Sequence, residues 1–174
     1  MAVLGLRRYG DPILRQVAAP VAEVTPEIKA LIADMIETMW HQVGIGLAAP
    51  QIGISHRIFV MDGGRGSSPR ALVNPIVTER SGVVREEEGC LSLPGIFAEV
   101  ERATRLCVEG LDGEGRPIAF EAQGLQAKIV QHELDHLDGV LFIDRLPPVT
   151  RDRIKKKIQK EGLEGHPRNH AFAL

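Results

Sequence analysis

Residues 132–136 read H-E-L-D-H, and this H-E-x-x-H spacing is typical of a metal site built on a helix. Side chains four positions apart lie on the same face of a helix, so His132 and His136 can both bind one cation. Glu133 lies one position further round, where its carboxylate can reach a water molecule on that cation. The motif therefore predicts a catalytic metal centre in which two ligands and a base come from one helical turn.

A catalytic site of this kind needs a third protein ligand. A third histidine is excluded, because Phe142 stands where the pattern H-E-x-x-H-x-x-G-x-x-H requires it. A downstream glutamate is disfavoured, because only Glu161 and Glu164 follow the motif and both lie among glycines. Cys90 is the remaining soft ligand, since Gly89 lets the backbone approach closely and a cation would hold the thiol as a thiolate. We expect the neighbours of Cys90 to leave it exposed rather than packed.

Residues 44–51, which read G-I-G-L-A-A-P-Q, are rich in small side chains. They match G-x-G-x-x-A, a pattern that can mark dinucleotide binding. The context argues against that function, because the glycines follow a helical pattern rather than a strand and Pro50 interrupts the helix that should start there. We interpret the segment as extended backbone that lies against a bound ligand, with the Gln51 amide free to donate a hydrogen bond.

The hydrophobic pattern predicts the helices that position these residues. Apolar residues at helical spacing predict a helix from Pro26 that ends at Gly44, and a second from Leu125 that Gly139 stops. A basic third helix is expected over about residues 148–162, followed by a flexible tail over residues 163–174. The second helix carries the H-E-x-x-H motif.

Short β-rich runs fill the middle of the sequence, separated by Gly, Pro, Asn and Ser. They predict strands at residues 58–61, 71–77, 83–87, 106–111 and 118–120. Helix, then strands, then helix does not follow the βαβ alternation of a parallel sheet. The fold class is therefore α+β with a largely antiparallel sheet.

Composition is that of an ordinary globular protein, with 44% hydrophobic and 25% charged residues, and 174 residues favour a single domain over 1–174. Lys and Arg total 21 against 23 Asp and Glu, and the net charge of −2 does not predict binding to nucleic acid or to an anionic membrane. The apolar runs are far shorter than the ~20 residues of a membrane helix, and no signal-peptide core is visible, so we expect a cytoplasmic protein. Both cysteines are expected to be reduced, with Cys107 an ordinary strand residue.

In chain order, residues 44–51, 88–92 and 131–139 resemble the three signature motifs of the peptide deformylases. The resemblance covers most of residues 5–146. It extends to G-D-P-I-L-R at residues 10–15, N-P at 74–75 and V-L-F at 140–142. It implies hydrolysis of the N-formyl group from the initiator methionine of newly made polypeptides, with release of formate. It also implies antiparallel sheets packed around a central helix that carries H-E-x-x-H.

The resemblance also implies the roles of individual residues. It gives three metal ligands, Cys90, His132 and His136. Glu133 would be the general acid and base, while the Leu91 backbone N–H and the Gln51 side chain would help the ion to stabilise the oxyanion. Arg102 matches a family arginine, and we expect it to pair with Glu88 and brace the metal loop. One divalent ion per chain is expected, iron(II) in many bacterial members, with zinc, nickel or cobalt also suited to this ligand set.

Substrate recognition is expected to combine backbone pairing with an apolar pocket for methionine. Ile45 and Gly46 would pair with the substrate backbone. Leu125 and Ile129 share a helix face with His132, which suits either one wall of that pocket or part of the core. The expected partners are N-formylmethionyl nascent peptides and, transiently, the ribosome.

Two regions depart from the family's pattern and leave contacts beyond the first substrate residue open. Gly95, Ile96 and Phe97 replace a polar stretch that ends in an arginine in many bacterial members. Glu86 stands where some relatives carry an apolar pocket residue.

Two other functions fit the metal motif. In a metal-binding scaffold without turnover, the cation would only tie the loop of Cys90 to the helix of His132. In an H-E-x-x-H peptidase, internal peptide bonds would be cleaved. Glu133 argues against the scaffold, because a structural site has no need of a carboxylate beside an open coordination position.

Overall fold

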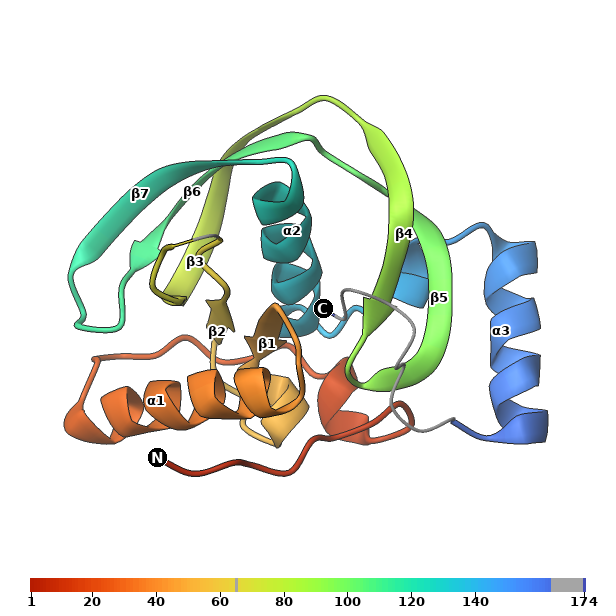
Figure 1. Cartoon of the computed structure of the whole chain (residues 1–174), viewed down its shortest axis with the longest axis horizontal. Helices are drawn as coiled ribbons and strands as arrows, with labels where there is room; N and C mark the ends of the chain where they lie inside the picture. The colour runs from red at the N-terminus through yellow and green to blue at the C-terminus, as the bar shows by residue number, and fades with distance from the viewer. Residues whose placement is uncertain (65, 164–173) are drawn as a thin grey trace.

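The computed structural model describes residues 1–64, 66–163 and 174 (Figure 1). Its helices are α1 (Pro26–His41), α2 (Leu125–Leu137) and α3 (Pro148–Glu161), with 3-10 turns at Pro12–Arg15, Ala49–Ile52 and Phe142–Arg145. Its strands are β1 (Gly46–Ala48), β2 (Ile58–Met61), β3 (Arg70–Ser81), β4 (Val84–Cys90), β5 (Leu93–Arg102), β6 (Arg105–Leu111) and β7 (Pro117–Gln123).

Five strands form one antiparallel sheet in the order β1-β2-β3-β6-β7, while β4 and β5 form a separate antiparallel ribbon. Figure 1 shows α2 between the five-stranded sheet and this ribbon, and α3 on the far side of the ribbon. Helix, antiparallel strands and helix follow one another along the chain, so the predicted α+β class is confirmed.

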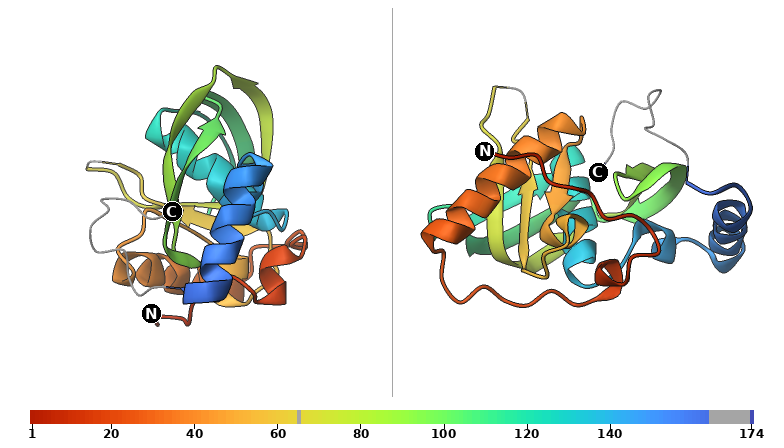
Figure 2. Two further views of the ribbon diagram at one scale, coloured as in Figure 1. Left: turned by 90° about the vertical axis from the view of Figure 1, so that its right-hand side faces the viewer. Right: turned by 90° about the horizontal axis from the view of Figure 1, so that it is seen from below.

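Strand β2 shows why two helices pack on one sheet. Successive side chains of a strand point to opposite faces. Phe59 and Met61 belong to the buried cluster that also contains Ile129 of α2, whereas Ile58 and Val60 belong to the cluster that contains residues of α1. The two helices therefore cover opposite faces, as the right-hand view of Figure 2 shows for α1.

Helix α1 ends earlier than predicted. Thr25 caps its start by accepting a hydrogen bond from the Ile28 N–H, and its last helical residue is His41. The left-handed position expected for Gly44 is taken by Val43, with φ of 57°, and the Gly44 N–H closes the helix on the Met39 carbonyl at 2.9 Å. Because the chain turns at Val43, Gly44 is buried in the segment that leads into β1.

Several strands differ from the prediction: β1 forms within the segment expected only to be extended, β3 continues to Ser81 rather than ending at Val77, and β7 continues to Gln123 rather than ending at Phe120. Strand β5 was not predicted, because Pro94, Gly95 and the charged residues at its end do not show a strand pattern. It forms because it pairs with β4 along nearly its whole length. Strand β4 continues to Cys90 rather than ending at Glu87, because it closes a tight hairpin onto Leu93.

Helix α3 packs on a third buried cluster, around Leu93 and Phe142, through Ile154 and Ile158. Most of the tail expected at residues 163–174 lies outside the described residues. Leu174 is described, and it is buried rather than exposed. In the described part of the chain, no helix is long and apolar enough to cross a membrane.

Candidate metal centre

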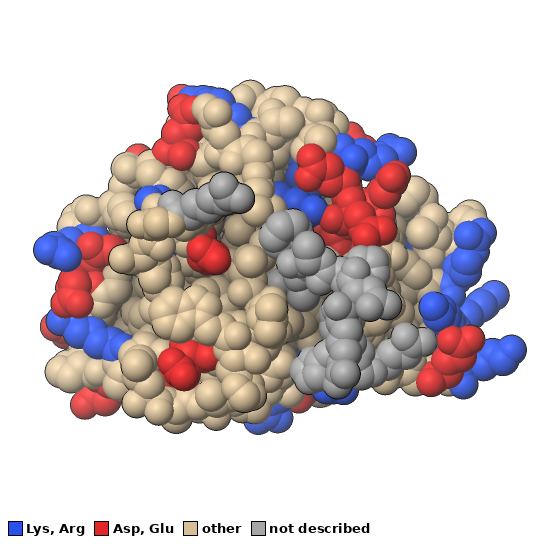
Figure 3. All heavy atoms as spheres, viewed as in Figure 1, with Lys and Arg blue, Asp and Glu red and all other residues tan. Residues whose placement is uncertain are grey.

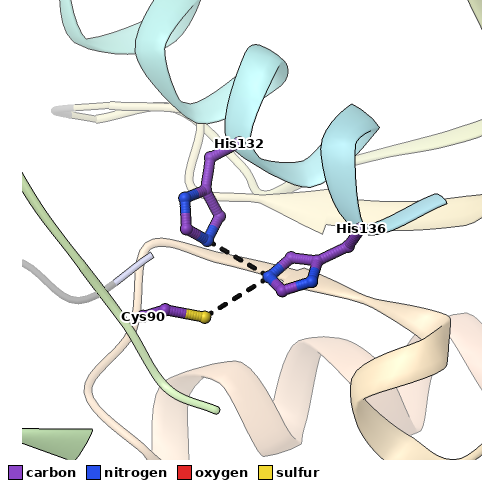
Figure 4. Close-up of side chains that lie close together, drawn as sticks. All are labelled: Cys90, His132 and His136. Carbon is purple, nitrogen blue, oxygen red and sulfur yellow. Dashed lines mark hydrogen bonds between the residues drawn. The ribbon is translucent and has the colours of Figure 1, made fainter. Parts of the chain in front are cut away.

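Three candidate ligand residues converge at one side of helix α2. His132 and His136 project from successive turns of α2, and Cys90 lies at the end of β4, where a register shift after Gly89 turns the chain (Figure 4). The His132 and His136 Nε2 atoms are 3.2 Å apart, and the Cys90 Sγ lies 3.3 Å from the His136 Nε2. The predicted trio is therefore brought together, with one ligand atom from each residue within 4.8 Å of the others.

These distances fit a single ion. A tetrahedral ion with sulfur at about 2.3 Å and nitrogen at about 2.0–2.1 Å holds its ligand atoms roughly 3.3–3.6 Å apart. Glu88 contacts the His132 Nδ1 at 2.9 Å, so the Nε2 of that ring faces the site. The donor set and its spacing therefore suit a divalent transition metal.

Cys90 is buried, with 2% of its surface exposed, so the expectation that it is exposed was wrong. Packing from the third cluster covers it, a long-range effect that its polar and glycine neighbours in the sequence do not reveal. Burial raises the pKa of the Cys90 thiol far above its usual value. A cation that binds the thiolate must therefore displace a proton.

Glu133 lies beside the candidate ligands, and its carboxyl group lacks a hydrogen-bond partner among the described residues. It is fully buried. Burial, followed by the nearby charge of Glu88, raises the pKa of Glu133 well above its usual value. Such a group suits proton transfer more than structural bracing.

Glycine at position 46 lets the backbone of β1 approach this carboxylate. A Cβ at Gly46 would lie 2.5 Å from the Glu133 Oε1 and 3.0 Å from a methyl carbon of Ile129. Only a residue without a side chain fits that gap. Because β1 is an edge strand of the sheet, the backbone around Ile45 and Gly46 has the position that pairing with an extended peptide requires.

The Gln51 amide is held in one orientation. Its Oε1 accepts a hydrogen bond from the Ala48 N–H at 2.9 Å, and its Nε2 donates to the Ser92 Oγ at 3.1 Å and contacts the Cys90 Sγ at 3.7 Å. The donor end of the amide is therefore aimed at the metal centre. Sequence reasoning missed Ser92, although it lies only two residues after the cysteine.

The expected pocket residues lie in different environments. Ile129 is 1% exposed beneath β1, whereas Leu125 is 41% exposed at the start of α2. Glu86 is exposed on β4 with Lys128 at 3.9 Å. Phe97 occupies the space beside Gly89, where an added Cβ would lie 2.3 Å from its ring. The pocket role of Leu125 and Ile129 stays a prediction.

A buried ionic network connects the end of β4, which carries Cys90, with helix α2. Arg102 donates to both carboxylate oxygens of Glu88, at 2.7 and 3.0 Å, so the predicted pair is confirmed. It also donates to Asp135 at 2.7 Å, and Asp135 in turn accepts from Arg145. Burial alone would raise the pKa of Glu88, but the hydrogen bonds from Arg102 and His132 outweigh it and lower that pKa to about 2. Sequence reasoning missed Asp135 and Arg145, although Asp135 lies within the H-E-x-x-H motif.

Replacing Arg102 with methionine is expected to destabilise the fold strongly. The variant leaves Glu88 and Asp135 buried without their cation, which costs about 3–5 kcal/mol of unfolding free energy at pH 7. Folding lowers the pKa of Glu88 from 4.5 to about 2. The ionised carboxylate therefore contributes fully to the free energy of unfolding above pH 4.5, and this contribution is lost as the pH falls toward 2. Urea titrations at pH 7 and pH 3 measure both effects.

The matched control is Arg105→Met, which removes an arginine that pairs with Glu79 and Glu121 at the surface. It should cause a much smaller loss of stability. Equal losses in the two variants would show that Arg102 does not act through buried charge.

Known proteins match both the sequence and the fold. The family model for polypeptide deformylase matches residues 3–152. The chain belongs to the peptide deformylase family. A peptide deformylase from Alkalilimnicola ehrlichii is 51% identical over 169 residues, which cover 95% of this chain and 94% of the relative.

Solved structures of peptide deformylases share the fold. The crystal structure from Legionella pneumophila matches with a TM-score of 0.86 at 40% identity, over 91% of this chain and 95% of that one. The structure from Thermus thermophilus matches with a TM-score of 0.85 at 47% identity, over the same shares of the two chains. As a member of the peptide deformylase family, the protein is a metalloenzyme hydrolase that removes the N-formyl group from nascent peptides. The scaffold and peptidase alternatives are thereby excluded.

Proposed function

We propose that Cys90, His132 and His136 hold one divalent ion, and that Glu133 is the general acid and base of deformylation. The proposal is supported above all by one juxtaposition: three ligand atoms within 4.8 Å of one another beside a buried carboxylate that lacks a hydrogen-bond partner among the described residues. When bound, the ion supplies a Lewis acid that activates water and polarises the formyl carbonyl.

Residues around the ion transfer the proton, stabilise the oxyanion and bind the substrate backbone. Glu133 accepts a proton from the attacking water and later delivers it to the departing amine. The Gln51 Nε2 and the Leu91 N–H donate hydrogen bonds to the former formyl oxygen as it gains negative charge. Each donor of this kind typically lowers the barrier by about 3 kcal/mol. Gly46 at the start of β1 and the preceding Ile45 pair with the substrate backbone.

We propose iron(II) as the physiological ion, with zinc, nickel or cobalt able to replace it. One thiolate and two imidazoles suit all four metals, and ions that bind more tightly than iron(II) displace it on isolation. Anaerobic purification with metal analysis and a formate-release assay on a formyl-methionyl peptide tests this. We expect about one iron per chain, and a loss of activity when air oxidises the iron(II) or zinc replaces it. Full activity with zinc and without iron would contradict the assignment.

We also propose a single domain over residues 1–174, a cytoplasmic location and a transient contact with the ribosome. Support for the contact comes from α3, whose basic side chains gather at one end of the molecule (Figure 3). The exposed cations of this helix are Arg153, Lys155, Lys156, Lys157 and Lys160.

A further inference from the structure

Leu174 is held beside the metal centre by its own backbone. Its N–H donates to the Gly89 carbonyl at 3.2 Å, and its carbonyl oxygen accepts from the Leu91 N–H at 2.9 Å. These two hydrogen bonds fall on either side of Cys90, the proposed metal ligand. Figure 1 marks this end of the chain beside α2 and the β4–β5 ribbon. Leu174 therefore pairs with the segment that carries the thiolate.

The side chain of Leu174 is enclosed as well. It is 1% exposed and belongs to the buried cluster that contains Ile129, with Ile45 packed against that cluster. Ile45 is proposed above to pair with the substrate backbone, and Ile129 is a predicted residue of the methionine pocket. Leucine and methionine have similar volumes and replace each other readily in apolar sites. A space that encloses Leu174 therefore suits the first side chain of a formyl-methionyl peptide.

Leu174 also uses a group that the reaction needs. The Leu91 N–H is the donor that the mechanism gives to the formyl oxygen, and one N–H cannot make both hydrogen bonds at full strength. Substrate and Leu174 are therefore alternatives at the same backbone donor.

From these contacts we propose that Leu174 is an internal competitor of the substrate, which must withdraw before a formyl-methionyl peptide binds. The inference rests on the proposed function for the identity of the displaced ligand. If Leu174 is withdrawn in only a fraction of the molecules, the apparent dissociation constant for substrate equals the intrinsic one divided by that fraction. Turnover at saturating substrate is unaffected, because bound substrate keeps Leu174 out.

Two variants of the metal-loaded enzyme test the competition. Leu174→Asp places a charge where the apolar side chain lies, and a chain that ends at residue 163 removes it altogether. Both should lower the KM for a formyl-methionyl peptide by about tenfold and leave kcat unchanged. The matched control is Leu163→Asp, which changes a half-buried leucine packed on the third cluster and should leave KM unchanged. An unchanged KM in both test variants would overturn the proposal.

A binding experiment without turnover keeps this test separate from the proposed function. A synthetic peptide with the sequence of residues 164–174 is titrated by calorimetry into the chain that ends at residue 163. It should bind, should be displaced by an unformylated methionyl peptide, and should lose its affinity when its last leucine is replaced by aspartate. Equal affinities of the leucine and aspartate peptides would overturn the proposal.

A KM of the intact chain that rises with protein concentration would also overturn it, because Leu174 would then come from a second copy. If formate is never released but the peptide binds as expected, the proposed function fails while the competition stands.

Discussion

Replacing Glu133 with glutamine should abolish deformylation while the protein keeps its metal. The amide has nearly the same size and shape as the carboxylate, and Glu133 is not among the three proposed ligands. The glutamine amide can neither accept a proton from water nor protonate the departing amine. Loss of a general acid or base typically lowers rates by about 10²–10⁴-fold. Because Glu133 serves in both steps, we expect kcat to fall toward the upper end of that range. Formate release and metal content are measured on the same preparation.

The control for this variant is Glu109→Gln, which changes an exposed glutamate on β6 and should leave kcat unaltered. Undiminished turnover in Glu133→Gln would reject the role of Glu133. A parallel loss of metal would place the carboxylate among the ligands instead. The amide should also be tolerated by the fold, since it replaces a buried polar group that lacks a hydrogen-bond partner in the described residues with another of nearly the same size and shape.

The local parts of the site are those that the sequence predicts well. The position of His132 and His136 on one face of α2 follows from helical geometry, which needs only a spacing of four residues. Extended backbone at Gly46–Ala48 follows from the glycines, which disfavour a helix, but Ala49–Ile52, whose first three residues were also expected to be extended, form a 3-10 turn with a proline in its first turn. In both cases the chemistry and its position depend on residues within a few places of one another.

Long-range packing determines the parts that the sequence does not reveal. Cys90 is buried by residues of a cluster assembled from β5 and the turn at Phe142, so its own neighbours give no sign of it. Arg102 reaches Asp135 across 33 positions of the sequence, and neither residue type nor spacing singles out that pair. Strand β5 forms through its partner β4 rather than through its own apolar pattern. Leu174 forms hydrogen bonds with Gly89 and Leu91, which lie still farther away in the sequence.

Replacing Cys90 with alanine should remove both the metal and the activity. The variant leaves two imidazoles as ligands, and since losing even a group that only orients a ligand costs about 10–100-fold in affinity, we expect the metal affinity to fall by at least about 100-fold. Metal analysis after dialysis and formate release measure the two losses, and circular dichroism checks that the fold survives. Cys107→Ala is the matched control, because it removes the half-buried free cysteine of β6 and should keep full metal content. A Cys90→Ala variant that retains one metal per chain would move the third ligand to another residue.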